Sequence, residues 1–192
     1  MHPSVAPRFM AQGLQKRAAL SAPRAAALRI AVGVCALTAA SKLQLPFWGT
    51  PVPFTLGPQM ALLLAALLGH REGVAVVLAW MGAGLMGAPV FASGLTGWAA
   101  LLGPTGGYVL GYLPAAYLVG RLSRKSVWVG VGAWLMASAV ILAVGAAGIG
   151  LWAGPRLMWP AGVAPFVMTD FCKALLGFSF FYGTQRASCG RC

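Results

Sequence analysis

The chain has 192 residues, of which 59% are hydrophobic and only 8% are charged, and its mean hydropathy is +0.81. This composition is too apolar for the surface of a water-soluble domain, so lipid must cover most of the molecule. Because a membrane span needs roughly 20 residues, we expect an all-α integral membrane protein with one domain and no separate soluble unit.

The net charge of +12 arises from 14 Lys and Arg residues against two acids, Glu72 and Asp170. In a soluble protein this ratio would suggest nucleic-acid binding. Here the basic residues lie mostly at the ends of apolar segments, as the positive-inside rule predicts for membrane proteins. The expected electrostatic partner is therefore the anionic lipid of the inner leaflet, and no nucleic acid is expected.

The amino-terminal residues 1–24 carry several basic side chains and no acid, which favours a basic cytoplasmic extension. A targeting peptide or a helix lying on the membrane surface is the alternative. Three prolines argue against one long helix in this region: Pro3, Pro7 and Pro23.

Six apolar segments follow, and each predicts one membrane-spanning helix. The second segment is short, so we expect its helix to be tilted or pushed into the fold. The approximate limits of the six segments are 25–45, 56–69, 73–91, 105–120, 127–151 and 161–182. Residues 25–183 thus form the membrane domain, and residues 184–192 form a tail on the same side as the amino terminus.

The distribution of Lys and Arg gives the orientation of these helices. Only Arg156 falls in a loop on the side opposite the termini, while Lys42 and Lys173 lie within apolar segments. The remaining basic residues share the side of the termini: Arg8, Lys16, Arg17, Arg24, Arg29, Arg71, Arg121, Arg124, Lys125, Arg186 and Arg191. The sequence therefore predicts a multi-pass membrane protein with both termini in the cytoplasm.

The two main outer segments, residues 46–55 and 92–104, contain no charge and are rich in Gly, Pro and aromatic residues. Their backbone polar groups cannot face hydrocarbon unpaired, so these segments must fold against protein or line a cavity. We expect both to cover a pocket.

Asp170 and Lys173 are the strongest candidates for a binding site. They stand three residues apart in the sixth segment, so one helix face carries both. Charges inside a membrane are rare because they are costly, and they usually face a helix-bundle interior or a wet cavity. The alternative is a self-neutralising pair that only joins helices. We interpret the other acid, Glu72, as a solvated loop residue.

A glycine-rich motif opens the fourth segment: Gly103, Pro104, Thr105, Gly106, Gly107 and Tyr108. Glycines would let a ligand approach backbone N–H groups at a helix start, where partial positive charge gathers. Close helix packing explains the same glycines equally well.

Proline-containing loops place aromatic residues at the outer ends of the second and third segments. Phe54 and Thr55 belong to the first loop and Phe91 to the second. Such residues form a rigid wall for a ring-shaped ligand, or they anchor the helices at the membrane interface. In the first segment, Ala36 and Ala40 form a face of small residues that suits internal packing or docking of a separate membrane subunit.

The ordered set of PVPFTL, GAPVFA, GPTGGY and Asp170-x-x-Lys173 resembles the BioY family of biotin transporters, the substrate-binding S components of energy-coupling-factor (ECF) transporters. The likeness covers about residues 25–182. It implies a six-helix S-component fold, capture of biotin from the outer side, and coupling through Ala36 and Ala40 to a membrane subunit driven by two ATPases. The sequence has no G-x-x-x-x-G-K-[ST] loop, so ATP hydrolysis would belong to those partners.

By this resemblance, Asp170 and Lys173 bond the polar head of biotin, and Phe54 and the glycine motif contribute to the site. No metal or other cofactor is implied. Two positions depart from the family pattern. Thr169 precedes Asp170 where the family usually has Gly, and Gly57 follows PVPFTL where the family usually has Gln, which leaves Gln59 without an assigned role.

Two other functions compete with this reading. An ion- or proton-coupled secondary transporter of a small vitamin-like substrate would use Asp170 as its proton carrier. A membrane enzyme is less favoured, because the sequence shows no Ser–His, Cys–His or metal-ligand cluster. Cys189 and Cys192 have CxxC spacing but no second ligand pair, so we expect a reduced tail.

Overall fold

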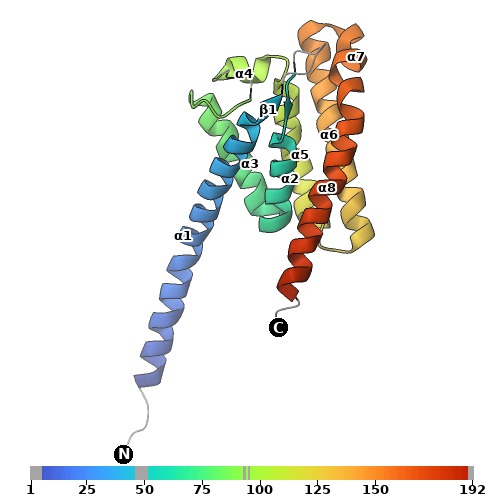
Figure 1. The fold of residues 1–192 in the computed structure, drawn as a ribbon. Helices are drawn as coiled ribbons and strands as arrows, with labels where there is room; N and C mark the ends of the chain where they lie inside the picture. Colours follow the sequence, from blue (N-terminus) through green and yellow to red (C-terminus); the bar gives the residue numbers. More distant parts are fainter. Residues whose placement is uncertain (1–5, 46–51, 93, 95, 190–192) are drawn as a thin grey trace, which may run out of the picture.

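The computed structural model describes residues 6–45, 52–92, 94 and 96–189 of the chain. Within them it is built almost entirely of helices, which confirms the all-α prediction (Figure 1). The long helices are α1 (Ala6–Lys42), α2 (Gly57–Leu68), α3 (His70–Leu85), α5 (Gly106–Leu122), α6 (Val127–Ala153) and α8 (Ala164–Cys189). Short elements complete the fold: β1 (Gln44–Leu45), β2 (Phe54–Thr55), α4 (Trp98–Leu102), the 3-10 turn η1 (Pro155–Leu157) and α7 (Met158–Gly162).

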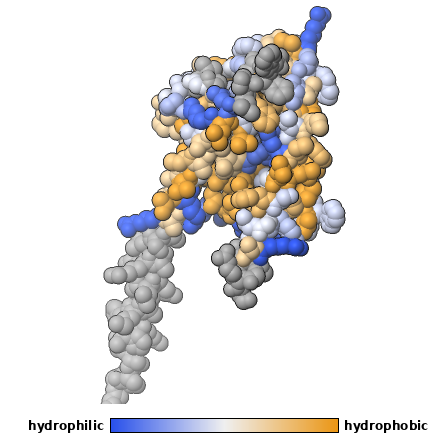
Figure 2. All heavy atoms as spheres, viewed as in Figure 1, coloured by the Kyte–Doolittle hydropathy of each residue, from blue (hydrophilic) through white to orange (hydrophobic). Residues whose placement is uncertain are grey.

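Each of the six predicted segments overlaps one of the long helices. Within the described residues, three helical stretches are long and apolar enough to cross a membrane: Pro23–Lys42, Val127–Ala153 and Ala164–Ala187. Helices α2, α3 and α5 are shorter, with 12, 16 and 17 residues. Apolar side chains cover most of the bundle flank shown in Figure 2. Leu176 and Phe180 are examples of large apolar side chains that are exposed in this structure.

The expectation that prolines break the amino-terminal region is wrong. Helix α1 is continuous from Ala6 to Lys42 and contains Pro23 in its interior. Pro7 lies in the first turn, where its missing N–H has no intrahelical acceptor to lose. The alanine-rich sequence around Pro23 favours helix strongly enough to continue through the single missing hydrogen bond.

The third and first helices also end earlier than predicted. Helix α3 stops at Leu85, because the chain reverses at Gly87, whose φ of 99° is in the left-handed region, and Pro89 follows. Helix α1 stops at Lys42, and β1 then pairs antiparallel with β2, with Gln44 opposite Thr55. The residues that follow α1 and α3 are therefore not helical and can line a binding site.

Small residues let the helices pack closely. Helices α5 and α6 make the most extensive pair in the bundle. At their crossing, a Cβ atom on Gly107 would lie 2.5 Å from the Val144 carbonyl oxygen and 3.0 Å from the Gly148 Cα atom. Backbones approach this closely only when side chains are absent, which is the common arrangement between membrane helices.

In the view of Figure 1, α1 and α3 lie on one side of the bundle, α6 and α8 on the other, and α2 and α5 between them. The amino-terminal end of α1 and the carboxy-terminal end of α8 lie at the same end of the molecule. The opposite end holds the β1–β2 pair, α4 and α7. This opposite end contains the candidate site.

Candidate functional site

A cavity with about 610 Å³ of empty space, part of it open to solvent, lies among the ends of α1, α3, α5 and α8. Its walls are mostly apolar, with two charged residues. The lining residues are Ser41, Val52, Pro53, Thr55, Pro58, Trp80, Phe91, Ala92, Thr105, Tyr108, Val109, Tyr112, Ile141, Phe166, Asp170 and Lys173. A cavity of this kind suits a small, largely apolar ligand with a polar group.

The two charges form an ion pair on one face of α8. The Lys173 ammonium lies 3.3 Å from the Asp170 carboxylate oxygen Oδ1, and the two side chains are 11% and 9% exposed. Lys173 also donates a hydrogen bond of 3.0 Å to the carbonyl oxygen of Thr55. The pair therefore faces the cavity and also connects α8 to strand β2.

Six of the residues singled out in the sequence lie on the cavity wall: Thr55, Phe91, Thr105, Tyr108, Asp170 and Lys173. Five others are not among the lining residues: Phe54, Gly103, Pro104, Gly106 and Gly107. The Phe54 ring centroid is 3.4 Å from the Lys173 ammonium. Phe54 therefore contacts one of the two charged residues of the cavity.

Two glycines of the motif, Gly106 and Gly107, lie in close backbone contacts. A Cβ atom on Gly106 would collide with the Leu101 backbone, and one on Gly107 would collide with α6. These contacts favour the packing interpretation of the motif. Tyr108 differs, because its ring lines the cavity while its hydroxyl donates to the Gly162 carbonyl oxygen at the end of α7.

Two aromatic residues on the wall were not singled out from the sequence, namely Trp80 and Tyr112. The Trp80 ring stacks on Tyr112, with centroids 5.9 Å apart and an interplanar angle of 14°. Phe91 meets the same tryptophan edge-on at 4.9 Å. One signal was available: Trp80 lies inside an apolar segment, whereas tryptophans that anchor at the interface lie near segment ends. Tyr112 follows Tyr108 by four residues, on the same helix face.

Both uncharged outer loops contribute to the wall. Val52 and Pro53 come from the first loop and Ala92 from the second. The Lys42 ammonium donates a hydrogen bond of 3.0 Å to the Phe91 carbonyl oxygen, which fixes the second loop to the end of α1. Parts of the two predicted caps, residues 46–51, 93 and 95, lie outside the described residues.

A second, almost wholly apolar groove runs between α1, α2 and α8, with about 830 Å³ of empty space. Its lining residues are Ala36, Ala39, Ala40, Leu43, Leu56, Gln59, Met60, Leu63, Gly177 and Phe180. Both candidate docking residues, Ala36 and Ala40, are among them. Gly33 instead packs inside the bundle, since a Cβ atom there would lie 2.7 Å from Val76 Cγ2.

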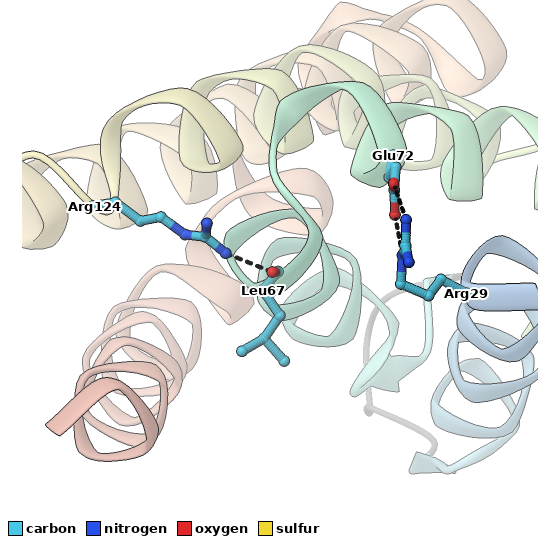
Figure 3. A network of polar contacts seen from close by, with 4 residues as sticks. All are labelled: Arg29, Leu67, Glu72 and Arg124. Atoms are coloured by element: carbon cyan, nitrogen blue, oxygen red, sulfur yellow. Dashed lines mark hydrogen bonds and ion pairs between the residues drawn. The ribbon is translucent and has the colours of Figure 1, made fainter. Parts of the chain in front are cut away.

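The interpretation of Glu72 as a solvated loop residue is wrong. Glu72 lies in the first turn of α3 and accepts two hydrogen bonds from Arg29, of 2.7 and 2.6 Å (Figure 3). The sequence could not show this pairing, because the two residues are 43 positions apart. Nearby, Arg124 donates to the carbonyl oxygens of Ala66 and Leu67 at the end of α2 (Figure 3). Both contacts lie far from the cavity.

Comparison with known proteins identifies the family. The model of the BioY family matches residues 14–188. The chain belongs to the BioY family. This confirms the resemblance found in the sequence motifs.

Individual BioY proteins agree with this assignment. The biotin transporter BioY of Thermotoga maritima is 36% identical over 132 residues, which cover 66% of this chain and 76% of that protein. The biotin transporter BioY of Rhodobacter capsulatus is 33% identical over 149 residues, covering 67% and 76%. A crystal structure of the S-component for biotin from an ECF-type ABC transporter shares the fold, with a TM-score of 0.74 at 23% identity over 86% of this chain and 93% of that one.

Proposed function

We propose that this chain is the biotin-binding S component of an ECF transporter and takes up biotin from the outer side of the membrane. Membership of the BioY family suggests the substrate. The observation that carries the proposal is the Asp170–Lys173 pair, held in the wall of an otherwise largely apolar cavity at the loop-covered end of the bundle.

The chemistry of the wall suits biotin. The ureido group of biotin offers N–H donors to a carboxylate and a carbonyl oxygen to an ammonium. Asp170 and Lys173 supply these two partners side by side. The apolar ring and alkyl chain would lie against the aromatic group of Trp80, Phe91 and Tyr112.

We further propose six spans with both termini in the cytoplasm, residues 1–24 forming a basic extension and residues 184–192 forming a tail. The shared end of α1 and α8 in Figure 1 supports this topology, as do the basic residues at the start of α3 and in the turn after α5. In this topology α8 begins on the outer side of the membrane. Because a helix rises about 1.5 Å per residue, Asp170 lies only about 9 Å along the axis from that end. The site would load from outside an inner membrane and close under its loops.

Transport by such a chain requires partners. The sequence contains no phosphate-binding loop for ATP, so energy would come from a membrane coupling subunit and two ATPase subunits. The groove that includes Ala36 and Ala40 is the proposed docking face for the coupling subunit, because small residues allow a helix of another chain to approach closely. No cofactor is proposed for the chain itself.

Equilibrium binding of labelled biotin to the purified full chain tests the proposal. We expect saturable binding without ATP or partner subunits, in protein shown by its unfolding transition to be folded. A proton-coupled secondary transporter would instead lose uptake when an uncoupler is added at constant ATP. A folded chain that does not bind biotin would contradict the proposal.

A further inference from the structure

Another pocket lies at the end of the bundle opposite the binding cavity, between the turn that joins α5 to α6 and the last turns of α8. It has about 570 Å³ of empty space, part of it open to solvent. Ser123, Arg124 and Ser126 line it from the turn, and Tyr182 and Gln185 line it from α8. These side chains make the pocket more polar than the apolar groove beside α1.

Arg124 is held in place but keeps unused donors. Its Nε and Nη2 atoms donate to the carbonyl oxygens of Ala66 and Leu67 at the end of α2 (Figure 3). In the described part of the chain, these bonds use two of the five N–H groups of the guanidinium, which leaves three. Because neutral carbonyl groups do not cancel its charge, the guanidinium can still pair with an anion.

Two serine hydroxyls add donors beside Arg124. The Ser123 hydroxyl oxygen accepts a hydrogen bond of 3.1 Å from the Trp134 indole N–H, and the Ser126 hydroxyl oxygen accepts one of 3.3 Å from the Val129 backbone N–H. A hydroxyl that accepts in this way can still donate its own hydrogen. Both hydroxyls can therefore donate to the oxygen atoms of an anion in the pocket.

The positive charge around the pocket is not compensated by acids. The chain contains two acidic side chains, and each of them forms an ion pair in another part of the fold. Further cations lie close by in the sequence: Arg121 and Lys125 flank the turn, and the guanidinium carbon of Arg186 lies 4.9 Å from the Tyr182 ring centroid. Hydrogen-bond donors together with uncompensated positive charge suit a phosphate group.

Large apolar side chains are exposed next to the same pocket. Trp128 is 85% exposed at the start of α6, and Phe180 is 62% exposed on α8. Apolar surface beside a basic rim suits a molecule that has both a charged group and hydrocarbon chains. A membrane lipid has both, whereas a free phosphate ion would use only the donors.

We propose that this pocket binds the phosphate headgroup of an anionic membrane lipid, with Arg124 as its counter-charge and the acyl chains along α6 and α8. Basic pockets between membrane helices on the cytoplasmic side suit acidic headgroups. The inference goes beyond the proposed uptake of biotin and does not depend on which ligand the binding cavity takes. A bound headgroup would connect the turn between α5 and α6 to α8.

Native mass spectrometry of the purified, delipidated full chain tests this inference. Phosphatidylglycerol and phosphatidylcholine with the same acyl chains are added separately, and inorganic phosphate is added as a competitor. We expect phosphatidylglycerol to bind roughly tenfold more tightly, because the choline group cancels the charge of the phosphate and charged hydrogen bonds are the strong ones. Inorganic phosphate at the same concentration should not displace it.

Three variants, each of which lowers the net charge by one, show whether the lipid binds in the pocket. Arg124→Gln and Gln185→Glu should each weaken phosphatidylglycerol binding roughly tenfold. Gln185 is exposed on α8, so this second variant leaves the bonds between Arg124 and α2 intact. Arg71→Gln is the matched control, because Arg71 is exposed at the start of α3 and does not line the pocket. It should bind within about twofold of the unchanged chain.

Equal losses in all three variants would overturn the inference, because net charge rather than the pocket would then attract the lipid. Equal binding of the two lipids would also overturn it. Unchanged phosphatidylglycerol binding in folded Gln185→Glu protein would place the lipid at another surface. Displacement by inorganic phosphate would show that a free anion, and not a lipid, is the ligand.

Discussion

The Lys173 ammonium lies 3.4 Å from the centroid of the Phe54 ring. Because the same ammonium also contacts the Asp170 carboxylate and the Thr55 carbonyl oxygen, it is held from three directions. A cation over a desolvated aromatic face is stabilised by roughly 2 kcal/mol. Phe54 and Thr55 thus place strand β2 against α8 and fix the position of the charge that the cavity presents to a ligand.

The ion pair gives the first prediction. Asp170→Asn and Lys173→Met should each weaken biotin binding tenfold or more, because a buried polar group left without its partner costs about 1–3 kcal/mol, and more when it is charged. Glu72→Gln is the control. It breaks an exposed pair far from the cavity, worth about 0–1 kcal/mol, so biotin binding should hardly change. Equilibrium binding to purified variants measures all three.

The double variant of Asp170 and Lys173 separates a ligand role from a purely structural one. If the pair only joins helices, replacing both residues removes the unpaired charge and should restore much of the lost binding. If both touch biotin, the double variant should bind no better than the weaker single variant. We expect the second result, and recovered binding in folded double-variant protein would contradict a ligand role.

The position of Lys173 gives the second prediction. Phe54→Leu removes the ring beneath the ammonium, and a contact worth about 0.5–2 kcal/mol corresponds to a twofold to thirtyfold loss of biotin affinity. Phe54→Tyr keeps an aromatic face and should bind nearly as well as the unchanged chain. Phe171→Leu is the matched control, since Phe171 is on α8 near Lys173 but is 52% exposed. Equal affinity of the Leu and Tyr variants would contradict this role.

The crossing of α5 and α6 gives the third prediction. Gly107→Ala should lower the free energy of unfolding by about 1–3 kcal/mol, because its methyl group would meet the α6 backbone. Gly132→Ala, on α6 with no heavy atom within 4 Å of the added methyl, should leave stability unchanged or slightly higher. Unfolding in detergent measures both. A stable Gly107→Ala protein that has lost biotin binding would instead favour direct contact of this glycine with the ligand.

The basic loops give the fourth prediction. A reporter enzyme that is active only in the cytoplasm should be active when fused after Cys192, because nearly all loop Lys and Arg residues share the side of the termini. Activity of an externally active reporter at the same position would overturn both the topology and the outward-loading site.

The groove beside α1 gives the fifth prediction. Ala36→Leu should reduce biotin uptake in cells that contain the coupling and ATPase subunits, because a larger side chain prevents close approach of a partner helix. Biotin binding by the purified variant should be unchanged. Cys35→Leu is the control, since this neighbouring residue is exposed and does not line the groove. Normal uptake in Ala36→Leu cells would argue against docking at this face.

The number and order of the long helices could be predicted from the sequence, because hydrophobicity over about 20 residues is a local property. It also placed Asp170 and Lys173 on one helix face, since residues three apart on a helix are neighbours whatever surrounds them. Helix ends were predicted less well. Pro23 did not end α1, and the turn at Gly87 ended α3 before Phe91.

Which residues meet depends on the tertiary structure. Trp80, Tyr112 and Ser41 come from three helices, and their common position at one cavity depends on how each helix is rotated about its axis. The same holds for Phe54, which contacts Lys173, and for Arg29 and Glu72. The helices of this chain are apolar on nearly all sides, so hydropathy hardly constrains how each one is rotated about its axis. Close packing of small residues must therefore set the rotation.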